Sequence, residues 1–135
     1  MNLDKYRIPQ SAIAGEWLEL PASDGARFLV KLPSQANREW QRENMQLLTD
    51  HGVDVKFDDK GELQQRTAID AGGAVRWQEA RLEAFARLCV LDGPPGFDRA
   101  LLLTEFYPAL QKLFALAQQR AEAEEVEAAR ASGES

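Results

Sequence analysis

A change in hydrophobic spacing, from every second residue to every third or fourth, constrains the fold of this chain more than any other feature. The segments 17–20 and 28–32 both show period-two spacing, which is typical of strands that bury one face. The segment between them, 21–25, ends in an Asp-Gly turn signal. The sequence therefore predicts an antiparallel β-hairpin over residues 16–32.

Beyond the hairpin, apolar residues recur mostly at helical spacing. Pro33 ends the second strand, and the Ser34 side chain can cap the first helix, which stops at Gly52. Pro94 and Pro95 cannot continue a helix, Asp98 can cap a short helix after them, and Pro108 suits the first position of another. These signals predict four helices, at about 34–51, 74–91, 98–106 and 108–118.

The segment between the first two helices contains a second strand signal. Residues 53–57 alternate cleanly, so we expect them to add a third strand to the hairpin. Gly72 and Gly73 should each cost a helix about 1 kcal/mol, which predicts a break before residue 74. The expected fold is mainly α with a small N-terminal antiparallel β-hairpin or three-stranded sheet, an α+β class.

Length and composition predict one globular domain, over residues 1–118, in a chain of 135 residues. With 44% hydrophobic residues the chain can form a core, so extensive disorder is not expected. Residues 119–135 are rich in glutamate and poor in large apolar side chains. We expect this acidic tail to be a solvated helix or frayed chain, and its deletion to leave the domain folded.

The net charge of −6 disfavours nucleic acid as a partner, because phosphate binding depends on clustered Lys and Arg. The single cysteine, Cys89, cannot form an internal disulfide, which is typical of a reducing compartment. We find neither a signal peptide nor an apolar run long enough to cross a membrane. We therefore expect no membrane partner and a location in the cytoplasm.

The residues that could carry chemistry favour structural interpretations. His51 is the only histidine and lies at an expected helix C-terminus, and Cys89 falls on an apolar stripe. Asp54, Asp58, Asp59 and Glu62 lack calcium-loop spacing, and the 93–96 loop lacks the Lys-Ser/Thr of a phosphate cradle. We expect no catalytic, cofactor-binding or metal-binding residues, and the chain is not predicted to be an enzyme.

Large apolar side chains supply the candidate partner-binding residues. The last predicted helix carries an apolar stripe that either closes the core or contacts a partner, formed by Leu110, Leu113, Phe114 and Ala117. The three tryptophans, Trp17, Trp40 and Trp77, are expected in the core, although one or two aromatic residues could anchor a partner.

Three N-terminal motifs resemble the start of bacteriophage tail assembly chaperones: Gly15-Glu16-Trp17, Asp24-Gly25-Ala26-Arg27-Phe28 and Asn37-Arg38-Glu39-Trp40. The C-terminal half is similar in plan, with a proline-bearing loop, a Tyr107-Pro108-Ala109-Leu110 junction and a final helix rich in Ala and Glu. Many such proteins carry Trp-x-Gly where this chain has Leu91-Asp92-Gly93.

The resemblance implies a non-enzymatic role in the host bacterial cytoplasm. Tail assembly chaperones of siphophages and related prophages bind the tape measure protein, keep it soluble and recruit major tail protein, and they leave before the virion is complete. Two alternatives stay open: a structural tail or head-tail connector component of the virion, and an acidic phage-encoded inhibitor of a host protein.

Overall fold

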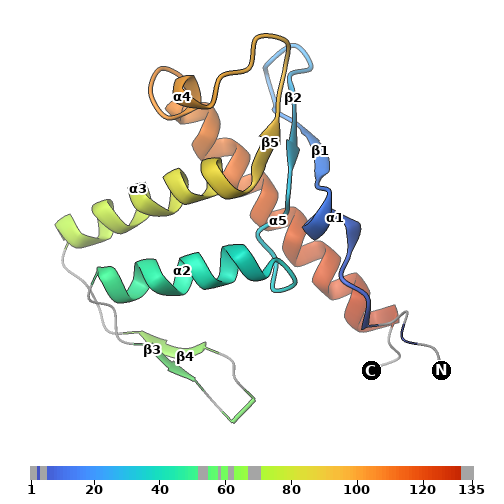
Figure 1. The fold of residues 1–135 in the computed structure, drawn as a ribbon, viewed down its shortest axis with the longest axis vertical. Helices are drawn as coiled ribbons and strands as arrows, with labels where there is room; N and C mark the ends of the chain where they lie inside the picture. Colours follow the sequence, from blue (N-terminus) through green and yellow to red (C-terminus); the bar gives the residue numbers. More distant parts are fainter. Residues whose placement is uncertain are drawn as a thin grey trace.

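The fold of this chain is described by a computed structural model, which covers residues 3, 6–51, 55–57, 59–60, 63–66 and 71–131, with backbone only for 55–57 and 63–66 (Figure 1). The helices are α1 (Gln10–Ile13), α2 (Arg38–Asp50), α3 (Ala71–Leu88), α4 (Arg99–Leu102) and α5 (Tyr107–Ala131). The strands are β1 (Glu16–Glu19), β2 (Arg27–Val30), β3 (Val55–Phe57), β4 (Leu63–Arg66) and β5 (Val90–Asp92). The expected fold class, mainly α with a small antiparallel sheet, is confirmed.

The predicted hairpin supplies two of the three strands of the sheet, with β2 in the central position. Strands β1 and β2 pair antiparallel, with Leu18 opposite Phe28 and Trp17 opposite Leu29. The turn that joins them needs left-handed backbone, with φ of 54° at Asp24 and 84° at Gly25. Asp and Gly are among the residues that adopt this conformation most readily, which is why the Asp-Gly signal located the turn.

The third strand of this sheet is β5, so the prediction that residues 53–57 join the hairpin is wrong. The sheet order is β1-β2-β5, and β3 pairs with β4 in a separate two-stranded sheet. Pairing β3 with β4 closes only a short loop, which costs little chain entropy. The backbone N–H of Lys31 donates to the carbonyl of Cys89 at 2.8 Å, and this contact directs the chain after α3 onto β2.

Several predicted helix boundaries need correction. The N-cap of α2 is Asn37 rather than Ser34, and its side chain accepts a hydrogen bond from the Trp40 N–H at 3.1 Å. Helix α3 includes Gly72 and Gly73, so no break precedes residue 74. Gly73 is buried, and tertiary packing can offset the weak helix propensity of glycine.

Helix α3 ends at Leu88, earlier than expected, because the next residues join the sheet as β5. The segment 98–106 contains only the short helix α4, followed by a turn into α5. The last helix is longer than predicted and continues to Ala131. The helical alternative for the acidic tail is therefore correct up to that residue.

Helix α5 runs diagonally past the sheet, and α2 and α3 lie side by side, extending to one side of it (Figure 1). Three aromatic rings meet where α2, α3 and α5 pack together. The ring of Phe114 lies 4.8 Å from that of Phe85 and 5.6 Å from that of Trp40, measured between centroids. Trp40 is in the core as expected, whereas Trp17 is 44% exposed on β1 and does not belong to it. The Arg27 guanidinium lies 5.8 Å from the Trp17 ring centroid.

The first part of the acidic tail packs against the N-terminal segment. Ala121 is buried, and the Ser11 hydroxyl lies 2.6 and 2.7 Å from the two carboxylate oxygens of Glu124. The Gln35 N–H donates to Glu125 at 2.9 Å. The expectation that the acidic tail of residues 119–135 offers little to bury is therefore wrong at Ala121, and Glu124 and Glu125 are partly buried.

Candidate protein interaction site

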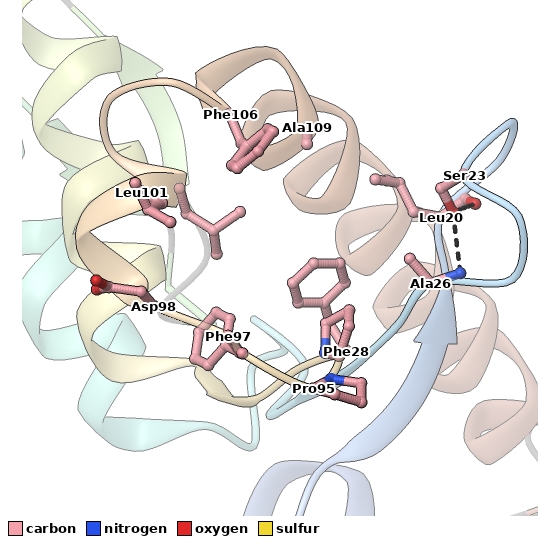
Figure 2. Close-up of a pocket in the computed structure, with 13 residues that line it drawn as sticks. Leu20, Ser23, Ala26, Phe28, Pro95, Phe97, Asp98, Leu101, Phe106 and Ala109 are labelled. Atoms are coloured by element: carbon pink, nitrogen blue, oxygen red, sulfur yellow. Dashed lines mark hydrogen bonds between the residues drawn. The ribbon is translucent and has the colours of Figure 1, made fainter.

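An apolar groove lies at the end of the molecule where the β1–β2 turn meets α4 and the start of α5 (Figure 2). Its volume is about 320 Å³, at the low end of the range of ligand pockets. Leu20 and Phe28 contribute from the hairpin, and Phe97, Leu101 and Phe106 from the segment before α5. The groove therefore unites two parts of the chain that are far apart in sequence.

The hairpin wall of the groove is held by side-chain hydrogen bonds within its turn. The Ser23 Oγ accepts from the Ala26 N–H at 3.1 Å and donates to the carbonyl of Leu20. The Leu20 N–H in turn donates to the carbonyl of Ala26 at 2.8 Å. These bonds fix the apolar side chains of the turn at the rim of the groove.

The opposite wall depends on the close approach of Phe97 to Gly93. A Cβ atom at Gly93 would lie 2.7 Å from Cδ2 of Phe97, too close for any other residue to fit without a shift. The Phe97 ring instead meets Phe28 edge-on, with centroids 6.0 Å apart and planes at 79°. The sequence predicted only a turn at 92–96; the structure adds that this turn places an aromatic side chain against the hairpin.

Helix α4 is anchored by hydrogen bonds to the end of α3 and to β5. Asp98 caps the helix as predicted, accepting from the Ala100 N–H at 2.9 Å. The Arg99 guanidinium donates to the carbonyls of Ala86 at 2.8 Å and Val90 at 2.7 Å.

Phe106, in the turn after α4, is 53% exposed although it lines the groove. An exposed aromatic ring beside an apolar hollow is typical of a binding surface.

The charged side chain that lines the groove is acidic. Among the described residues that line it, Asp98 is the only charged one and none is basic. Asp24 and Glu105, next in sequence to the lining residues Ser23 and Phe106, are exposed. Asp24, Asp98 and Glu105 are called the acidic rim below.

The stripe proposed for partner binding, Leu110, Leu113, Phe114 and Ala117, lies in the core of the monomer. In this part of the chain, the residues that line the groove are Phe106, just before α5, and Ala109, in the first turn of α5. Helical periodicity identified the apolar face of α5 but did not reveal which apolar residues other elements would cover. The signal for the groove was two phenylalanines, Phe97 and Phe106, in a segment rich in turns.

The residues considered for chemistry occupy structural positions. His51 is the C-cap of α2, as predicted, and its N–H donates to the Leu47 carbonyl at 3.1 Å. Cys89 is buried, and this burial raises the pKa of its thiol to about 12, so it stays protonated at neutral pH.

No group of three or more His, Cys, Asp or Glu side chains suited to a metal ion occurs within the described ranges. Asp54, Asp58 and Glu62, considered above, lie outside them. In the same part of the chain, no helix is long and apolar enough to cross a membrane.

In comparisons with models of known protein families, with curated proteins and with solved structures, nothing matched this chain.

Proposed function

We propose that this protein is a tail assembly chaperone of a long-tailed bacteriophage or prophage, which binds the tape measure protein and helps to recruit major tail protein. The three N-terminal motifs and the Tyr107-Pro108-Ala109-Leu110 junction, which resemble that family, support the proposal. Under it, the protein acts in the host cytoplasm and is absent from the mature virion.

The observation that carries the proposal is the apolar groove with the exposed ring of Phe106. A long helical client exposes apolar stripes until other subunits enclose it, and such stripes aggregate unless they are covered. Grooves that accept the apolar face of an amphipathic helix are a recurrent means of recognising such clients.

Charge supports the same role. The chain carries a net charge of −6, and a bound layer of acidic subunits would give the complex a repulsive surface. That repulsion would keep the client dispersed while its apolar stripe is covered. The acidic surface is also compatible with an inhibitor of a host protein, so binding to the client decides between these roles.

Co-expression with the tape measure protein encoded by the same phage tests the proposal. We expect the tape measure protein to be insoluble alone, and to be soluble and to co-purify with this chain when both are present. A tape measure protein that stays insoluble and does not bind would contradict the proposal. Mass spectrometry of purified virions gives the second readout, because stoichiometric amounts of this protein there would favour a structural tail or connector component instead.

A further inference from the structure

We infer that the groove recognises an amphipathic helical segment that carries large apolar side chains on one face and Lys or Arg beside them. This inference rests on the proposed function for the identity of the client, and it adds the chemistry of the segment that binds.

The apolar part of the contact comes from three phenylalanines at graded depth. Phe28 is buried, Phe97 is partly buried against it, and Phe106 is mostly exposed and lies across the hollow from them (Figure 2). Leu20 and Leu101 complete the apolar walls on either side. A large apolar side chain entering from solvent would contact the rings of Phe97 and Phe106 and shield Phe106 from water.

The groove is built to contact the side chains of a client rather than to pair with its main chain. Phe28 is the only one of its described lining residues that lies within a strand, and the others come from turns, loops and helices. A groove walled in this way suits the apolar face of a helix better than main-chain pairing with an extended peptide.

The two arginines next in sequence to lining residues are engaged elsewhere. Arg27 alternates with Phe28 along β2 and lies over Trp17 on the other face of the sheet. Arg99 is directed at the carbonyls of Ala86 and Val90. The negative charge of the acidic rim is therefore not balanced by these arginines, and basic side chains of a client would complement it.

The same charge disfavours a second copy of this chain as the occupant. The chain is acidic as a whole, with a net charge of −6, so a second copy would bring further negative charge to the rim. Nucleic acid is disfavoured for the same reason.

The test measures binding of two fluorescein-labelled synthetic helical peptides by fluorescence anisotropy. Both carry the same face of Leu and Phe, and the polar face is Lys in one peptide and Glu in the other. We expect the Lys peptide to bind more tightly, and its affinity to fall with added salt because the rim charges are screened.

Two variants separate the apolar and charged contributions. Phe106→Ala should weaken binding of the Lys peptide by about tenfold or more, as expected for an aromatic anchor. The triple variant Asp24→Asn, Asp98→Asn, Glu105→Gln should weaken it by about three- to tenfold at low salt and remove most of the salt dependence. Asparagine preserves the helix cap at 98 and tolerates the positive φ at 24, so the fold is retained.

Val75→Ala is the matched control, because Val75 is 57% exposed on α3 and does not line the groove. It should leave peptide affinity unchanged. Equal binding of the Glu peptide, or unchanged affinity in Phe106→Ala, would overturn the inference. Self-association of the protein that Phe106→Ala abolishes, measured by sedimentation, would also overturn it, because a second copy would then occupy the groove.

The outcomes for the groove and for the chaperone role are distinguishable. Peptide binding without solubilisation of the tape measure protein would support the groove chemistry and remove the proposed function. Solubilisation that both the Phe106 and the rim variants retain in full would support the function and overturn the inference.

Discussion

Two phenylalanines eight positions apart, Phe106 and Phe114, lie in opposite environments. Phe114 is 2% exposed and packs against Phe85 and Trp40, whereas Phe106 is 53% exposed and lines the groove. The first is a structural residue and the second is available to a partner.

We therefore expect Phe114→Ala to lower the free energy of unfolding by about 3–5 kcal/mol, as for a buried ring that leaves a cavity. Phe106→Ala should change it by less than about 1 kcal/mol, because the ring loses little burial. Urea denaturation followed by circular dichroism measures both. Equal destabilisation by the two substitutions would contradict the assignment of Phe106 to a binding surface.

For individual residues, the sequence predicted correctly those positions that depend on local chemistry alone. The Asp98 cap and His51 at the end of α2 follow from the preferences of helix ends. It did not separate the buried stripe of α5 from the residues of the groove, because that depends on which other elements cover each side chain. Asn37 rather than Ser34 caps α2, and its Nδ2 also donates to the carbonyl of Leu32, two residues after the end of β2, at 3.1 Å. This hydrogen bond depends on the path of the chain between β2 and α2, which the preferences of helix ends do not predict.

At the scale of elements, the extension of α5 is the main difference from the sequence prediction. Its residues 120–125 contact the N-terminal half through Arg120, which lies 3.1 Å from Glu16, and through Glu124 and Glu125. A segment that is poor in large apolar side chains can still contribute to folding when its carboxylates are hydrogen bonded.

Truncation tests this contribution. Deletion of residues 119–135 should lower the free energy of unfolding by about 2–4 kcal/mol, because it removes Ala121 from the core and the hydrogen bonds of Glu124 and Glu125. The control, deletion of 127–135, removes side chains that are exposed over the described range 127–131 and should change stability by less than about 1 kcal/mol. Chemical denaturation measures both, and equal stability of the two truncated proteins would show that 119–126 contribute nothing.

The strands illustrate what periodicity can and cannot predict. The hairpin has both alternation and a turn signal, so its partners were identified from the sequence. Strand β5 is only three residues long and follows a helix directly, so its pairing depends on where α3 ends in the fold. The helix break predicted at Gly72 and Gly73 was wrong for a similar reason, because helix propensity is a weak preference that packing overrides.

At the scale of the whole molecule, the core and the groove occupy different places. The rings of Trp40, Phe85 and Phe114 pack together where α2, α3 and α5 meet. The groove lies beside the β1–β2 turn, and the ribbon has this turn at one end (Figure 1). A surface at the end of the molecule can bind a client without rearrangement of the core. We therefore expect binding to change the structure only around the groove.

Amide hydrogen exchange of this protein, free and in complex with the tape measure protein, tests that claim most directly. We expect slower exchange on binding in residues 20–28 and 93–109, which surround the groove, and unchanged exchange in α2. Protection confined to α2 and α3, with unchanged exchange around the groove, would contradict it.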